Sequence, residues 1–195
     1  PQPNEVLVDA CAAPGGKSTH AAMRMCQTGR IFAIDRHPQR TRLIQDAAKK
    51  QGISTIEALA ADFEEWAATS DVLADRVLLD VPCSGTGVLS KRADARWQRA
   101  EKDLQDLLQR QEKLLDAATQ TVKAGGLLVY STCSIEYEEN EAQVTAFLQR
   151  HPNFRREAIP DLPPELRNAQ GAYQSLPFKN GMDGAYAVRL RKTAS

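Results

Sequence analysis

The chain has 195 residues, of which 42% are hydrophobic and 26% are charged, a composition that fits one globular domain with a real core. Lysine plus arginine and aspartate plus glutamate number 25 each, so the net charge gives no sign of a nucleic-acid binder, and any such binding must be local. The four cysteines form no C-x-x-C pair and the three histidines are isolated, which excludes a typical zinc site or disulfide framework. We therefore expect no metal site and a reducing compartment.

The first predicted element is a strand that leads into a cradle for a ligand. Residues 6–9 are apolar and end in Asp9, and small residues with a glycine pair follow over 11–17, before a helix over 18–25. Gly15 and Gly16 let the backbone approach a ligand, and the free N–H groups of the helix offer hydrogen-bond donors. The segment is not a Walker A loop, because that motif needs glycine six positions before Lys17 and the residue there is a cysteine. The dinucleotide fingerprint G-x-G-x-x-G is also absent.

The rest of the chain alternates between short apolar strands and amphipathic helices. Further strands are predicted over 30–35, 55–60, 76–81, 127–134 and 184–192, and further helices over 39–51, 101–123 and 138–150. The second helix is expected to bury Leu43, Ile44 and Ala47, and Cys26 is expected in the core. The proline-rich region 152–183 predicts loop or weak strand. This order predicts an α/β fold with a doubly wound, mostly parallel sheet and an antiparallel final strand.

Side chains that carry chemistry follow the predicted strands. In a doubly wound sheet, ligands bind beyond the carboxyl ends of the strands. Six residues fall at or just past such ends: Asp9, Asp35, Asp62, Asp80, Cys83 and Cys133. Asp35 lies about twenty residues after the glycine pair, the offset at which an acid accepts hydrogen bonds from a ribose diol. A single aspartate often caps a helix and a lone cysteine is usually a small buried hydrophobe, but six such positions together favour a site.

Three motifs resemble those of a known family. They are DACAAPGGK over 9–17, DVPCSGTG over 80–87, and YSTCSI over 130–135 followed by EENE over 138–141. Together they resemble the signatures of S-adenosylmethionine-dependent RNA 5-methylcytosine methyltransferases, and most of all the bacterial Sun/Fmu type that modifies small-subunit ribosomal RNA. The resemblance runs from Pro1 to about Arg150 and returns weakly over 183–192. It implies a Rossmann-like methyltransferase fold, with residues 1–195 as one catalytic domain.

The resemblance also implies roles for single residues. Asp35 would bind the ribose of S-adenosylmethionine, Asp62 would lie near its adenine, and Asp80 would lie toward its methionine end. The cradle would line the same cofactor through Cys11, Ala12, Ala13, Pro14, Gly15, Gly16 and Lys17. Cys133 would add to carbon 6 of cytosine, so that carbon 5 becomes nucleophilic, and Cys83 would assist release of the product. DNA cytosine-5 methyltransferases use the Pro-Cys thiol as nucleophile instead, so the choice of Cys133 depends on its Ser-Thr-Cys-Ser context.

The implied partner is RNA with a single-stranded or flipped cytosine. Candidate phosphate contacts surround Trp97, which would stack on a base, although a solvated helix start with a buried tryptophan is an equal interpretation. These contacts are Lys91, Arg92, Arg96 and Arg99. Two positions depart from the family pattern: Arg92-Ala93-Asp94 replaces a His-Pro-Asp-like segment, and Ala185 replaces an aromatic residue.

Other functions remain open on the sequence alone. They are a methyltransferase acting on transfer RNA or protein, a non-catalytic S-adenosylmethionine-binding module, and an NAD oxidoreductase. The thiol pair argues against a protein substrate and would have no role in an oxidoreductase, and a non-catalytic module would have lost Cys83, Cys133 or Asp80. No membrane segment or signal peptide is evident, so we expect a cytoplasmic monomer. Because Pro1 stands just before a core strand, we expect an excised piece without the family's N-terminal RNA-binding region.

Overall fold

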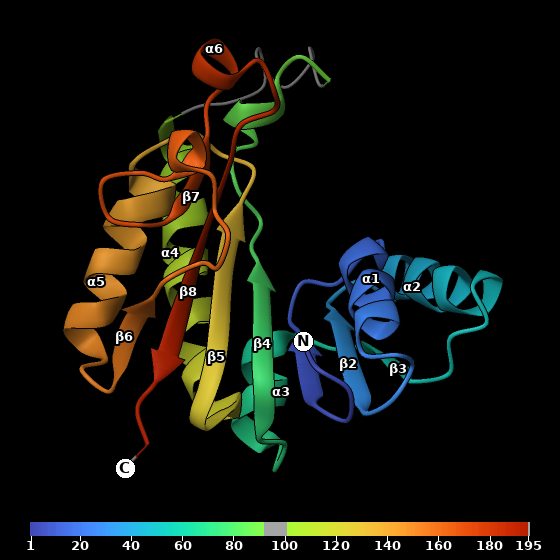
Figure 1. The fold of residues 1–195 in the computed structure, drawn as a ribbon. Helices are drawn as coiled ribbons and strands as arrows, with labels where there is room; N and C mark the ends of the chain where they lie inside the picture. The colour runs from blue at the N-terminus through green and yellow to red at the C-terminus, as the bar shows by residue number, and fades with distance from the viewer. Residues whose placement is uncertain (92–100, 195) are drawn as a thin grey trace.

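The computed structural model describes residues 1–91 and 101–194, and this part of the chain is built around an eight-stranded mixed sheet (Figure 1). The strand order is β3-β2-β1-β4-β5-β8-β6, with β7 paired to β8. The strands are β1 (Val6–Asp9), β2 (Arg30–Asp35), β3 (Ile56–Ala60), β4 (Ala74–Asp80), β5 (Val122–Thr132), β6 (Phe154–Glu157), β7 (Tyr173–Ser175) and β8 (Ala185–Lys192). β1 to β5 pair parallel with one another, whereas β8 pairs antiparallel with β5, β6 and β7. The predicted parallel sheet with an antiparallel final strand is therefore confirmed.

The helices cover both faces of the sheet (Figure 1). They are α1 (Gly16–Arg24), α2 (Pro38–Lys50), α3 (Phe63–Thr69), α4 (Glu101–Thr121), α5 (Gln143–Arg150) and α6 (Pro177–Asn180), with the short turns η1 (Thr86–Val88), η3 (Glu138–Ala142) and η4 (Pro164–Leu166). None of the described helices is long and apolar enough to cross a bilayer.

Alternation along the strands explains why two layers of helices form. On β1, Leu7 packs with Met25 beside α1, whereas Val8 belongs to the larger core beneath α3 and α4. On β2, Ile31 belongs to the core beside α1, and Phe32 belongs to the larger core beneath α3 and α4. Successive side chains of a strand point to opposite faces, so strands that are apolar at every position need helices on both sides. This double burial produces the doubly wound architecture that places all parallel strand ends at one edge.

Two predictions about the core are wrong. Leu43 is 49% exposed, because the inner stripe of α2 is formed by Thr41, Ile44 and Ala48. Cys26 is exposed as well. It lies beyond the end of α1, in a turn with a left-handed backbone (φ of 53°), and not on the buried face of the helix.

Two other segments differ from the predicted elements. The short helix α3 was not predicted, although Asp62 caps it by accepting a hydrogen bond from the Glu64 amide at 2.9 Å. The predicted helix over 138–150 begins as the π-helical turn η3, in which the Ala142 amide donates to the Tyr137 carbonyl five residues earlier. A π-turn places side chains at spacings that an α-helical pattern does not predict.

Candidate active site

The carboxyl ends of the parallel strands border a cleft of about 480 Å³. Five of the six predicted strand-end residues line this cleft: Asp35, Asp62, Asp80, Cys83 and Cys133. The sixth, Asp9, lines a smaller cavity of about 290 Å³ that shares Cys11, Ala13 and Asp80 with the cleft. The topology therefore brings together residues that are more than one hundred positions apart in the sequence.

The predicted cradle lines the smaller cavity. In addition to the residues named above, this cavity is lined by Ala12, Pro14, Gly16 and Lys17 of the cradle. Gly15, between Pro14 and Gly16, has φ of 106°, a left-handed backbone conformation that residues with a side chain rarely adopt. A Cβ atom at Gly15 would also lie 3.1 Å from the Ile44 backbone, so this glycine sets how closely the cradle packs on α2. The cradle is held between β1 and α2 with its small side chains toward the cavity.

Asp9 is a buried acid with an unused oxygen. Its Oδ2 accepts a hydrogen bond from Ser18 Oγ at 2.6 Å, but its Oδ1 has no partner among the described residues. Burial raises the pKa of Asp9 to about 6. An unpaired carboxylate oxygen in a buried cavity is costly and fits a site that a donor or cation from a ligand completes.

Asp35 and Asp62 are held at the far side of the cleft. Asp35 is 5% exposed, accepts a hydrogen bond from the His37 amide at 3.0 Å, and lies 3.3 Å from an Arg40 guanidinium nitrogen. Asp62 uses Oδ1 to cap α3 while lining the cleft. The helix-capping and ligand-binding interpretations of Asp62 are thus compatible, since a carboxylate has several acceptor positions.

Asp80 connects the cradle to the end of the neighbouring strand. Its Oδ2 accepts from Lys17 Nζ at 2.7 Å, and its Oδ1 accepts from Ser131 Oγ at 2.7 Å. These bonds join the first turn of α1 to the carboxyl ends of β4 and β5. The pairing with Asp80 raises the pKa of Lys17 against the opposing effect of burial. The two charges fix each other's positions beside the thiols.

Cys83 and Cys133 are in direct contact. Their Sγ atoms lie 3.2 Å apart, and the Cys133 amide donates to Cys83 Sγ at 3.3 Å. The hydrogen bond with Cys133 and burial raise the pKa of the Cys83 thiol. When one sulfur of such a pair is ionised, the other stays protonated and donates to it, because two adjacent thiolates would repel each other. The pair can therefore hold one thiolate beside one thiol, but not two thiolates, at the same point of the cleft.

Sequence reasoning missed Arg110, which lines the cleft from α4 together with Leu107 and Leu114. These three residues share one face of the helix, since they are spaced three and four positions apart. A cation within an otherwise apolar stripe was the signal in the sequence. His37 and Arg40 on the other side of the cleft were missed too.

The predicted RNA contacts are only partly described. Arg92, Arg96, Trp97, Arg99 and the Arg92-Ala93-Asp94 departure lie outside the described residues. Lys91 is described, and its Nζ lies 2.5 Å from an Asp183 carboxylate oxygen. The departure at Ala185 falls at the start of β8.

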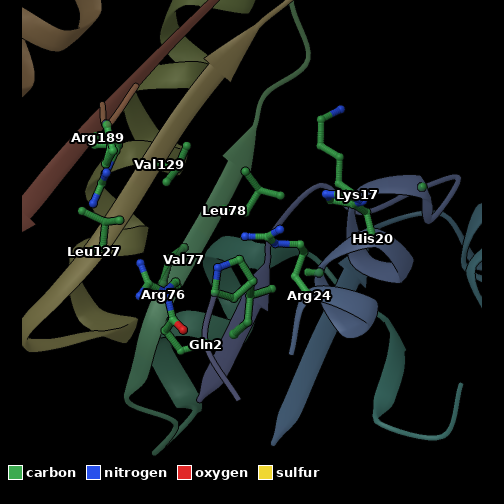
Figure 2. A pocket seen from close by; sticks show the side chains of 15 residues that line it. Gln2, Lys17, His20, Arg24, Arg76, Val77, Leu78, Leu127, Val129 and Arg189 are labelled. Carbon is green, nitrogen blue, oxygen red and sulfur yellow. The ribbon is translucent and has the colours of Figure 1, made fainter. Parts of the chain in front are cut away.

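A larger cavity of about 590 Å³ lies elsewhere, on the face of the sheet beside α1 (Figure 2). Leu78, Leu127 and Val129 contribute apolar side chains to it, with Arg24 and Arg76 nearby (Figure 2). It shares Gly16 and Lys17 with the cradle but contains neither thiol. Because five of the six strand-end residues, including both cysteines, line the cleft of about 480 Å³, chemistry is expected there.

Known proteins are similar to this chain over nearly its whole length. A curated relative from Synechocystis, named probable ribosomal RNA small subunit methyltransferase B, is 40% identical over 196 residues, covering 98% of this chain and 44% of the relative. The crystal structure of PH0851 has a TM-score of 0.92 at 36% identity and covers 98% of this chain and 43% of that one. A structure of NSun6 from Pyrococcus horikoshii with SFG has a TM-score of 0.90 at 29% identity, covering 100% of this chain and 50% of that one.

This chain spans less than half the length of the curated relatives that it matches. A family model described as 16S rRNA methyltransferase RsmB/F matches residues 1–191. The match includes all three motifs, the cradle and both thiols. The chain therefore belongs to the 16S rRNA methyltransferase RsmB/F family.

Proposed function

We propose that the protein transfers a methyl group from S-adenosylmethionine to carbon 5 of a cytosine in RNA through a covalent cysteine adduct, with small-subunit ribosomal RNA as the substrate. The observation that carries this proposal is the contact between Cys83 and Cys133 at the end of a cleft that also holds Asp35 and Asp80. The relatives' names support ribosomal RNA as the substrate. SFG, present in a related structure, is an analogue of S-adenosylmethionine.

The residues around the cradle fit S-adenosylmethionine. When bound, this group supplies a methyl attached to a positively charged sulfur. The unpaired oxygen of Asp9 and the carboxylate of Asp80 line the small cavity and suit the ammonium end of the methionine portion. Asp35 suits the ribose diol and Asp62 has an oxygen left for the adenine amino group. The cradle from Cys11 to Lys17 then packs along the molecule between these two ends.

The thiol pair supports an addition mechanism. Carbon 5 of cytosine is a poor nucleophile until the Cys133 thiolate adds to carbon 6, forming an S–C bond and moving electron density to carbon 5. Cys83 keeps its proton during this step, because its pKa is raised, and it donates to the neighbouring sulfur. After methyl transfer, a base takes the proton from carbon 5, the C–H electron pair restores the double bond between carbons 5 and 6, and the S–C bond breaks with its electron pair returning to Cys133. Cys83 assists this release.

The proposal extends to the surroundings of the reaction. Residues 1–195 act as the catalytic domain of a cytoplasmic monomer, and the cytosine must leave its stack to reach the thiols. Asp80 lines the same cleft as the thiols and orients the edge of that base, while Lys17 and Ser131 hold its carboxylate.

The test is to identify the product. The protein is incubated with methyl-labelled S-adenosylmethionine and unmodified 16S ribosomal RNA, and the digested RNA is analysed by mass spectrometry. We expect labelled 5-methylcytidine from the wild type and from Cys26→Ala, an exposed cysteine outside the cleft. Cys133→Ala should give none. Label on another nucleoside, or on protein alone, would overturn the proposal.

A further inference from the structure

Behind the two thiols lies a buried polar cluster that the mechanism has not used. The π-helical turn η3 carries Glu139, Asn140 and Glu141, which are 0%, 1% and 5% exposed. Arg156 pairs with Glu141, but the side chains of Glu139 and Asn140 are hydrogen-bonded to neutral groups. Buried polar side chains are costly unless they are fully hydrogen-bonded, so their partners indicate what the cluster holds in place.

Glu139 holds the turn that carries Cys83. Its Oε1 accepts hydrogen bonds from the Ser84 amide at 2.8 Å and from Gln111 Nε2 at 2.9 Å, and its Oε2 accepts from Ser84 Oγ at 2.5 Å. Gln111 Nε2 also donates to the Pro82 carbonyl at 2.9 Å. The residues on both sides of Cys83 are thus fastened to one carboxyl group and one amide.

Asn140 holds the turn that carries Cys133 in the same way. Its Oδ1 accepts from Thr132 Oγ1 at 2.6 Å, and its Nδ2 donates to the Ser134 carbonyl at 2.9 Å. Thr132 and Ser134 are the two neighbours of Cys133 in the chain. Two adjacent residues of one π-turn therefore each form hydrogen bonds to a different cysteine turn, Glu139 to that of Cys83 and Asn140 to that of Cys133. Single π-turns inside helices are often found at functional sites.

We propose that Glu139 and Asn140 are positioning residues, each acting on a different step of the reaction through its own cysteine. This inference rests on the proposed function. Reacting groups displaced by about 1 Å lose about a hundredfold in rate. Loss of the Asn140 brace misplaces Cys133 and slows formation of the covalent RNA adduct. Loss of the Glu139 brace misplaces Cys83 and slows release, so the adduct accumulates.

The experiment compares Glu139→Ala with Asn140→Ala, using 16S ribosomal RNA and S-adenosylmethionine, and measures both turnover and RNA covalently bound to protein. We expect turnover to fall by about ten- to a hundredfold in both. Adduct should rise above wild type in Glu139→Ala and fall below it in Asn140→Ala. A merely structural defect in Glu139→Ala would lower adduct together with turnover. In Asn140→Ala it would also weaken the rise in Tm caused by S-adenosylmethionine, which a positioning role leaves at the wild-type level. Glu138→Ala, an exposed residue of the same turn, is the matched control and should behave as wild type.

Shape-conserving variants separate hydrogen bonding from folding. Glu139→Gln keeps an acceptor for the Ser84 amide and Gln111, and the Ser84 hydroxyl can accept from the new amide, so this variant should retain turnover within a few-fold. Asn140→Asp replaces the donor to the Ser134 carbonyl by an oxygen and should lose adduct. Gln111→Met preserves volume while releasing the Pro82 carbonyl, and should accumulate adduct even if Glu139→Ala does not fold.

Cys83→Ala and Cys133→Ala are measured in the same experiment. They separate failure of the positioning inference from failure of the proposed function. If the cysteine variants show accumulated and absent adduct respectively, but the Glu139 and Asn140 series change adduct in the same direction, the positioning inference is overturned. If the cysteine variants themselves form no adduct and keep full activity, the proposed function is the part that fails.

Discussion

Asp9 illustrates, at the scale of single residues, how burial changes what a side chain can do. It is 1% exposed, and burial raises its pKa to about 6. One of its oxygens lacks a partner in the described part of the chain. Ionised Asp9 therefore disfavours the folded state until a donor or cation reaches it. Such an acid is held in place by the rest of the fold for binding rather than for stability.

This leads to a prediction about pH. Because the folded pKa lies above the ordinary value of 3.8, the stability contributed by Asp9 is fully present below about pH 4 and is lost as the pH rises through about 6. Asp9→Asn should match the wild type near pH 4 and exceed its free energy of unfolding at pH 8, by at most about 3 kcal/mol. Urea denaturation of both proteins without ligand, from pH 4 to 8, measures this difference. A gap that is the same at every pH would contradict the assignment.

The site was predictable from the sequence where it depends on strand boundaries. Asp35, Asp80 and the two cysteines follow apolar runs, and a parallel sheet gathers such ends at one edge. The bond between Lys17 and Asp80 was not predictable, since it depends on how β1 and β4 lie side by side. The place of Arg110 in the cleft depends similarly on the packing of α4.

At the scale of elements, the two thiol turns are joined through a close contact of glycines. The Gly87 amide donates to the Cys133 carbonyl at 3.0 Å, and the Gly184 amide donates to the Gly87 carbonyl at 2.8 Å. The turn after β4, the turn after β5 and the start of β8 thus meet at Gly87. A side chain has no room there, because a Cβ atom would clash with the Gly184 carbonyl and lie 2.8 Å from the Cys133 carbonyl oxygen.

Gly87→Ala should therefore push the turns apart. We expect a loss of about 2 kcal/mol or more in the free energy of unfolding, together with reduced methyl transfer, because the clash is with backbone that cannot rotate away. Gly16→Ala is the stability control, since a Cβ there meets nothing within 4 Å. Denaturant unfolding of the two variants measures the difference. Equal stability of Gly87→Ala and the wild type would show that the turns move freely.

Elements were predictable when their pattern was long. The helical stripe of α4 and the apolar runs of β2 and β5 were enough to predict these elements, although β5 begins at Val122, five residues before the predicted start. The helix α3 has only seven residues, and its cap, Asp62, had already been interpreted as a ligand-binding acid. The π-turn η3 depends on tertiary hydrogen bonds to the thiol turns, which helical periodicity does not contain.

At the scale of the whole molecule, the alternation of strands and helices was enough to predict the sheet and its antiparallel final strand. A net charge of zero also indicates that binding of RNA must depend on local groups rather than on an overall field. The residues proposed to bind the cofactor, in contrast, lie at or just after the described strand ends. The 195-residue chain is therefore expected to bind S-adenosylmethionine without RNA.

Thermal unfolding tests this expectation. At a ligand concentration of a hundred times Kd, binding adds about 2.7 kcal/mol, which for a chain of this size raises Tm by about 5 to 10 °C. NAD should leave Tm unchanged. Asp35→Asn should weaken the shift by S-adenosylmethionine, whereas Asp46→Asn, on the exposed face of α2, should not. A shift with NAD would contradict the choice of cofactor, and an undiminished shift in Asp35→Asn would contradict the predicted ribose contact.

The central claim is that Cys133 forms the bond to RNA and Cys83 assists its release. The most direct measurement is denaturing electrophoresis of Cys83→Ala and Cys133→Ala after incubation with labelled 16S ribosomal RNA and S-adenosylmethionine. The account predicts that Cys83→Ala retains RNA covalently on the protein and that Cys133→Ala retains none. The reverse pattern would make Cys83 the nucleophile, and full activity without adduct in both variants would contradict the thiol mechanism itself.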